Sequence, residues 1–92
     1  MRVVAGTARG LRLAAPAGDR VRPTSDRVRE ATFNALNSLD AIDGARVLDL
    51  FAGSGALGIE ALSRGARSCT FCDTSAAALA SVRANLEHTG FT

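Results

Sequence analysis

The chain has 92 residues, of which 47% are apolar and 22% are charged, and its formal net charge is +2. This composition is too apolar for a disordered chain, and no apolar run approaches the roughly 18 to 20 residues needed to cross a bilayer. The opening residues, M-R-V-V-A-G-T-A-R-G, lack the apolar core of a secretory signal. We therefore expect a cytoplasmic protein.

Positive charge is concentrated at the N-terminal end. Residues 1–30 carry seven arginines and three acidic residues, or +4, whereas residues 31–92 carry four arginines and six acidic residues, or −2. Weak alternation in residues 1–6 and 10–15 predicts a β-hairpin, so that residues 1–20 form a basic extension. Such a segment indicates a polyanionic partner, with a merely solubilising arm as the alternative.

A helix follows this segment. Thr24 or Ser25 can cap it, Asp26 suits its first turn, and it should end near Asp40. Its apolar residues recur at helical spacing and predict the buried face: Val28, Ala31, Ala35, Leu36 and Leu39.

The remaining chain alternates strands and helices. The stretch R-V-L-D-L-F-A-G-S-G-A-L-G-I-E over residues 46–60 predicts a buried strand, a glycine turn and the start of a helix that ends near Arg64. A second strand over residues 67–72 and a helix over residues 75–88 follow. This order predicts an α/β fold with a parallel sheet. Because two strands make an incomplete sheet, we expect residues 21–92 to be the N-terminal half of a Rossmann-like domain.

The glycine turn predicts a cofactor site. Gly53-x-Gly55-x-x-Gly58 fits the dinucleotide fingerprint, and Asp73 stands where a ribose-binding acid belongs. Asp49 discriminates between cofactors, because a carboxylate in the preceding strand suits the ammonium of S-adenosylmethionine (AdoMet) better than a pyrophosphate. Two structural alternatives remain open: Asp49 could cap a backbone N–H of the turn, and Asp73 could cap the following helix.

Cys69 and Cys72 have C-x-x-C spacing, but they lie in a predicted strand, where positions three apart point to opposite faces. The chain has no second cysteine pair, and His88 is its only histidine. We interpret both residues as buried thiols and expect no metal site.

Three stretches resemble one known family, the RsmD-type 16S ribosomal RNA guanine-N2 methyltransferases. They are R-V-V-A-G-T-A-R-G-L-R-L near the N-terminus, R-P-T-S-D-R-V-R-E-A-T-F-N over residues 22–34, and V-L-D-L-F-A-G-S-G-A-L-G-I-E-A-L-S-R-G-A over residues 47–66. The middle stretch is the most specific to the family, while the last is shared by many AdoMet enzymes.

The resemblance implies a Rossmann-like class I methyltransferase fold that binds AdoMet and methylates a guanine of small-subunit (16S) rRNA. The residues that would bind the cofactor are Asp49, Phe51, Gly53, Ser54, Gly55, Asp73 and Thr74, together with Thr24 and Arg27. Those that would bind RNA phosphate are Arg2, Arg9, Arg12, Arg20 and Arg22.

One family feature is missing from the sequence. The catalytic signature, Asn or Asp followed by Pro-Pro and an aromatic residue, does not occur, since the only prolines are Pro16 and Pro23. No residue of this chain is therefore assigned a catalytic role. Two other functions remain open: a non-catalytic RNA- or nucleotide-binding module and an NAD-type oxidoreductase.

Overall fold

The computed structural model describes residues 1–14, 26–50 and 52–91. Its three helices and two strands alternate after an N-terminal segment without regular structure, in the order α1 (Asp26–Ser38), β1 (Arg46–Leu50), α2 (Ala56–Ser63), β2 (Ser68–Cys72) and α3 (Ala76–Thr89). These bounds agree closely with the elements predicted from the sequence. None of the described helices is long and apolar enough to span a membrane.

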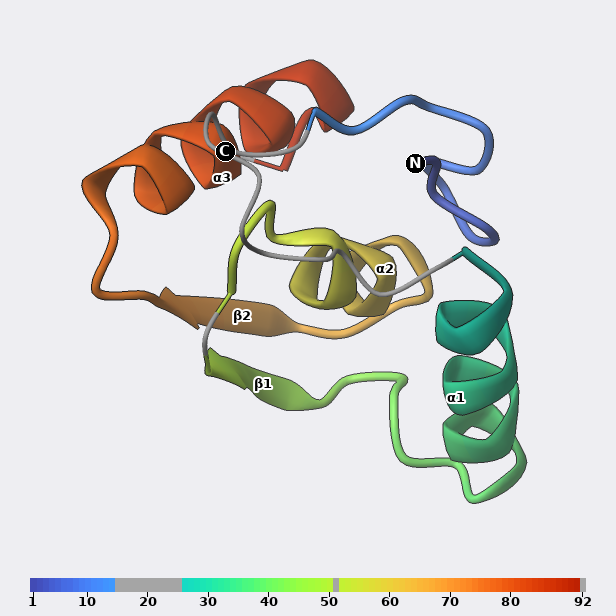
Figure 1. Ribbon diagram of the computed structural model, residues 1–92. Coiled ribbons are helices and arrows are strands. Elements are labelled where there is room, and N and C mark those ends of the chain that lie inside the picture. Colours follow the sequence, from blue (N-terminus) through green and yellow to red (C-terminus); the bar gives the residue numbers. More distant parts are fainter. Residues whose placement is uncertain (15–25, 51, 92) are drawn as a thin grey trace.

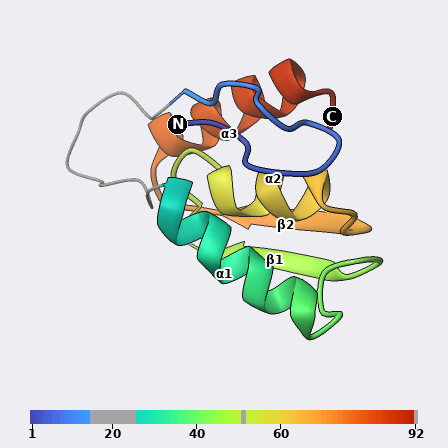
Figure 2. The ribbon, with the colours of Figure 1, turned by 90° about the vertical axis from the view of Figure 1, so that its right-hand side faces the viewer.

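The two strands form a parallel sheet connected by α2. Their register runs from Arg46 opposite Ser68 to Leu50 opposite Cys72. Helices α2 and α3 lie on one side of this sheet, where α2 contacts both strands and α3 contacts β2 (Figures 1 and 2). On the other side, Leu48 and Leu50 are each 59% exposed, because no described element covers that face.

The caps explain where α3 begins and ends. Its N-cap residue, Ser75, accepts a hydrogen bond from the backbone N–H of Ala78 at 3.2 Å. At the other end Gly90 has φ 84°, a left-handed conformation that glycine adopts without a steric penalty.

Residues 1–14, here called the N-terminal arm, fold back on themselves. A single antiparallel bridge joins Arg2 to Arg12, and backbone hydrogen bonds run from Val3 N–H to the Leu11 carbonyl at 3.0 Å and from Leu13 N–H to the Met1 carbonyl at 2.9 Å. The predicted hairpin is thus present as a pair of antiparallel segments with one bridge. The predicted boundary at residue 20 lies outside the described residues.

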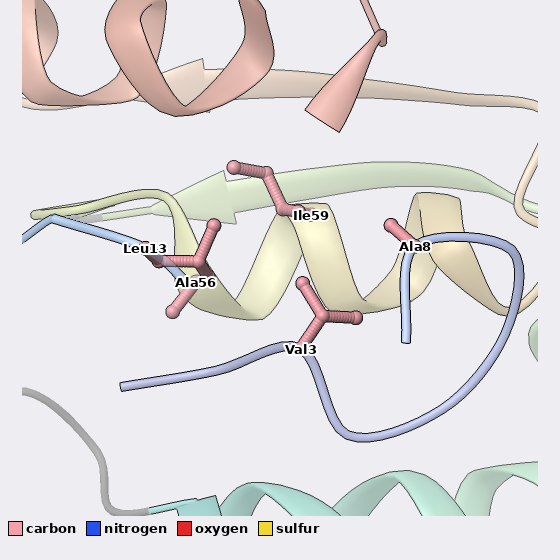
Figure 3. Packing of buried hydrophobic residues seen from close by; sticks show 5 residues of the cluster. All are labelled: Val3, Ala8, Leu13, Ala56 and Ile59. Atoms are coloured by element: carbon pink, nitrogen blue, oxygen red, sulfur yellow. The ribbon is translucent and has the colours of Figure 1, made fainter. Parts of the chain in front are cut away.

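The N-terminal arm packs against α2. Three of its side chains share a buried core with two of the helix, as Figure 3 shows: Val3, Ala8, Leu13, Ala56 and Ile59. Burying such apolar groups stabilises the fold by about 25 cal/mol per Å² removed from water. The arm is therefore part of the same packed structure as the glycine turn and its helix.

The prediction of which face of α1 is buried is wrong. Val28 is 55% exposed and Leu39 is 76% exposed, while Ala31 and Ala35 also face outward. The helix instead buries Arg29 and Phe33 toward the body of the protein, with Leu36 partly buried beside them. A charged residue occupies the inner face because its charge is neutralised there.

Asp26, three residues earlier on α1, pairs with Arg29 Nη2 at 2.7 Å. The second partner is a buried carboxylate, Glu60 of α2. Its Oε1 accepts hydrogen bonds from Arg29 Nε at 3.2 Å and from the backbone N–H of Val4 at 2.9 Å. Its Oε2 accepts from Arg64 Nε at 2.8 Å and from the N–H of Ala5 at 3.0 Å. Glu60 and Arg29 have fully buried side chains, so this charge cluster connects the N-terminal arm, α1 and α2.

Candidate functional site

The turn between β1 and α2 depends on glycine at two positions. Gly55 caps α2 in a left-handed conformation, with φ 81° and no side-chain cap, and its N–H donates to the Ala52 carbonyl at 2.8 Å. At Gly58, a Cβ would lie 2.6 Å from Cys69 Sγ and would collide with the Phe71 ring. Any larger residue would push α2 away from β2, so Gly58 brings the helix N-terminus close to the sheet.

Asp49 points from β1 toward that helix N-terminus. Its Oδ2 accepts a hydrogen bond from the Gly58 N–H at 3.0 Å, and the residue is only 6% exposed. Burial raises the pKa of Asp49, the bond from Gly58 opposes that rise, and the charge of Asp73 adds to it. The capping role that the sequence left open is thus present, while Asp49 Oδ1 has no hydrogen bond among the described residues.

Asp73 follows β2 and connects the turn to α3. Its Oδ2 accepts from the Gly53 N–H at 3.0 Å, and its Oδ1 accepts from the Ser75 N–H at 2.9 Å. These backbone hydrogen bonds, with that from Ser75 first, lower the pKa of Asp73. Asp73 is therefore charged at neutral pH and contacts the glycine turn. The alternative that Asp73 caps α3 is wrong, because the N-cap of that helix is Ser75.

An open pocket lies where the two strands end. It has a volume of about 240 Å³ and is lined by Leu50, Cys72, Asp73 and Thr74. The carboxyl ends of parallel strands are where ligands bind in open α/β sheets. Asp73, the acid expected to hold ribose hydroxyls, thus lines a pocket at the expected edge of the sheet.

The other predicted cofactor residues differ in where they lie. Ser54 is buried, and its hydroxyl accepts from the Ala56 N–H at 3.3 Å and lies 3.7 Å from the Met1 sulfur, so this side chain serves the start of α2. Arg27 is exposed in the first turn of α1. Thr24 and Phe51 lie outside the described residues.

The predicted RNA-binding arginines include three that the structure describes. Arg2, Arg9 and Arg12 are exposed on the N-terminal arm, and within the described residues none of them forms an ion pair. Arg2 also donates from Nη1 to the Gly10 carbonyl at 3.1 Å, which helps to fix the turn of the arm. Arg20 and Arg22 lie outside the described residues.

The two cysteines are free thiols that belong to different environments. Cys69 is partly buried, and burial together with the charge of Asp49 raises its pKa to about 11. Cys72 is exposed and lines the pocket, so the prediction that both thiols are buried is wrong for Cys72, which stands on the uncovered face of the sheet. Among the described residues, no group of three or more His, Cys, Asp or Glu side chains could hold a metal ion.

Asn85 of α3 is a site-supporting residue that the sequence analysis missed. It is 3% exposed, and its Nδ2 donates to the Ser54 carbonyl at 2.8 Å and to the Ala14 carbonyl at 2.9 Å. Its Oδ1 accepts from the Ala14 N–H at 2.9 Å. One amide thus joins α3, the glycine turn and the end of the N-terminal arm.

Comparison with known proteins identifies the family. The profile of the family described as "Conserved hypothetical protein 95" matches residues 1–92. The chain belongs to this family. It is 51% identical over 87 residues to "Putative rRNA methyltransferase YlbH" of Bacillus subtilis, an alignment that covers 95% of this chain and 46% of that protein.

Two further relatives agree with this assignment. Ribosomal RNA small subunit methyltransferase D of Escherichia coli K12 is 49% identical over 73 residues, which cover 79% of this chain and 36% of the relative. The solved structure of "Putative methyltransferase yhhF" from Escherichia coli superimposes with a TM-score of 0.81 at 41% identity, covering 95% of this chain and 45% of that one. These matches confirm the resemblance to the RsmD-type family and the partial Rossmann-like methyltransferase fold.

The chain spans less than half the length of these relatives. Their names concern the longer proteins.

Proposed function

We propose that the chain is the cofactor-binding half of an AdoMet-dependent methyltransferase that modifies guanine N2 in small-subunit (16S) rRNA in the cytoplasm. The observation that carries the proposal is the arrangement of two carboxylates around one glycine turn. Asp49 bonds the N–H of Gly58 and Asp73 bonds the N–H of Gly53, and Asp73 also lines the pocket at the strand ends. The names of the relatives favour rRNA as the substrate.

The residues present fit AdoMet at this site. Asp49 Oδ2 is used by Gly58, but Oδ1 has no hydrogen bond among the described residues and can accept from an ammonium group. A carboxylate oxygen has two lone pairs, so each oxygen of Asp73 retains one for a ribose hydroxyl beside its backbone bond. When bound, AdoMet would supply an electrophilic methyl group.

The residues of this chain have defined tasks in the proposal. Asp49 would hold the ammonium end of the cofactor, and Gly53 and Gly55 would let the backbone approach it closely. Asp73 would orient the ribose, with Thr74 beside it in the pocket wall. Arg9 and Arg12 would bind RNA phosphate, since a guanidinium without an ion pair is free to form charge-assisted hydrogen bonds.

Calorimetry on the complete gene product tests the cofactor assignment. We expect S-adenosylhomocysteine to bind and NAD not to compete with it. In a separate assay we expect transfer of a labelled methyl group from AdoMet to 16S rRNA. Binding of NAD in place of AdoMet would support an oxidoreductase instead. Salt-dependent RNA binding without cofactor binding or methyl transfer would support the non-catalytic RNA-binding module.

A further inference from the structure

A second hollow lies away from the strand ends, between the N-terminal arm and α3. It is a groove of about 390 Å³, walled by residues 12–14 of the arm on one side and by Ala84, Asn85 and His88 of α3 on the other. Figure 1 shows the arm running beside the second half of α3, with the glycine turn beneath. Among the residues that the structure describes, the groove shares no lining residue with the pocket at the strand ends.

Among the described residues, the lining is apolar with one cation, Arg12, and contains no acidic side chain. Ala14 and Ala84 are exposed and provide apolar surface, whereas Leu13 is only 6% exposed; Arg12 and His88 come from opposite walls. An apolar peptide would leave the Arg12 guanidinium unpaired, and a bare inorganic anion would not use the apolar surface. A nucleotide has both parts, because its phosphate can bind a guanidinium and its base can lie on apolar surface or on the guanidinium plane.

The placement of Arg12 supports a polyanion as the occupant. The bridge puts Arg12 directly opposite Arg2, so the two side chains leave the same face of the arm. Like charges directly opposite one another destabilise such a pair. Val3 and Leu13, the next residues, point to the other face and into the core. A phosphate chain crossing this face would relieve the repulsion.

The groove is also held in a fixed shape. The amide of Asn85 in its lining is fully engaged by both backbone groups of Ala14 and by the Ser54 carbonyl. Asn85 therefore connects the two walls to each other and connects the α3 wall to the glycine turn. A preformed groove loses less conformational entropy when a ligand binds than one that must assemble.

We infer that this groove binds an unpaired nucleotide of the RNA substrate, at a position distinct from the guanosine that is methylated. The inference rests on the proposed function, since RNA is the polyanion it commits to. An unpaired nucleotide is favoured because a base within a duplex would first have to be unpaired and unstacked before it could enter the groove.

A substitution that introduces a negative charge into the groove tests the inference. Ala84 is exposed and lines the groove. Ala80, one turn earlier on α3, is also exposed but does not line it. We expect Ala84→Glu to weaken binding of a fluorescent single-stranded RNA by about tenfold in anisotropy titrations, since like charges repel across a binding surface. Ala80→Glu, which changes the net charge equally, should weaken it far less.

Arginine variants provide an independent measurement. Arg12→Ala should reduce the slope of log affinity against log salt by about one unit, as loss of one phosphate contact does. Arg46→Ala, on the uncovered face of the sheet, is the matched control. Equal losses from Ala84→Glu and Ala80→Glu, or equal slopes for the two arginine variants, would overturn the inference. Tighter binding of duplex than of single-stranded RNA would overturn it as well.

The same titrations separate this inference from the proposed function. If the unmodified protein binds S-adenosylhomocysteine and RNA while the groove variants bind RNA normally, only the groove assignment fails. If the unmodified protein binds no RNA at any salt concentration, the proposed substrate fails with it.

Discussion

The carboxylate of Asp49 accepts a hydrogen bond from the backbone N–H of Gly58, 3.0 Å away, across the junction between β1 and α2. A carboxylate at a helix N-terminus is favourable, because it satisfies a free N–H and complements the helix dipole. Burial nevertheless raises the pKa of Asp49, with the Gly58 bond opposing and the charge of Asp73 adding to that rise. The charged form is thus disfavoured in the folded protein, although a neutral side chain could also accept the bond.

Replacement of Asp49 separates its structural role from its proposed role in binding. A folded pKa above the unfolded value means that stability falls as pH rises through that range, so ionised Asp49 lowers stability at neutral pH. Asp49→Asn should therefore melt at the same temperature or higher at pH 7. Its affinity for S-adenosylhomocysteine should fall by more than about tenfold, because a hydrogen bond to a charged group contributes about 1.5–3 kcal/mol.

The pH dependence of binding gives a check on the same residue. In the unmodified protein, affinity should rise with pH through the raised pKa of Asp49, and calorimetry of Asp49→Asn should lack that rise. A variant that loses stability yet binds S-adenosylhomocysteine normally would show that Asp49 only caps α2.

The two cysteines provide a probe of the pocket. Cys72 lines it beside Asp73, whereas the pKa of Cys69 is raised to about 11 by burial and by the nearby charge of Asp49. Because the thiolate is the reactive form, a thiol reagent at pH 8 should modify Cys72 first and Cys69 far more slowly. S-adenosylhomocysteine should slow the fast reaction, and Cys72→Ser should abolish it. Unchanged labelling of Cys72 at saturating ligand would place the ligand elsewhere.

The amide of Asn85 predicts a link between α3 and the glycine turn. In Asn85→Asp, an oxygen would replace the Nδ2 that donates to the Ser54 and Ala14 carbonyls, leaving two buried acceptors without a donor. Each unsatisfied buried group costs about 1–3 kcal/mol. We expect the variant to be less stable in urea titrations and to bind S-adenosylhomocysteine more weakly in calorimetric titrations. Asn37→Asp, an exposed position on α1, should change neither.

Local signals in the sequence predicted most of the fold. Ser75 and Gly90 mark the ends of α3, and the glycines after β1 mark the turn, because each acts on the backbone within a few residues. The buried face of α1 could not be predicted in this way. Arg29 is buried where it pairs with Asp26, three positions earlier, and with Glu60, 31 positions later. The first pairing is local, but the second leaves no local pattern. The same holds for Asn85 and its partners on the arm and the turn.

Glu60 should be the residue of this charge cluster whose loss is most damaging. It is fully buried and pairs with Arg29 and Arg64, while both of its oxygens also accept backbone N–H groups of the N-terminal arm. Removing the Glu60 carboxylate leaves Arg64 without this ion pair and leaves Arg29 its pair with Asp26, and breaking a buried pair by removing one partner costs about 3–5 kcal/mol. Glu60→Gln should therefore lose about that much free energy of unfolding in urea titrations, whereas Glu87→Gln, exposed on α3, should lose almost none. The arm carries Arg9 and Arg12, so a protease that cleaves after arginine can cut it once it detaches. Limited proteolysis of Glu60→Gln should therefore cleave residues 1–14 before the helices. Equal protease resistance of the arm in both variants would contradict its attachment through Glu60.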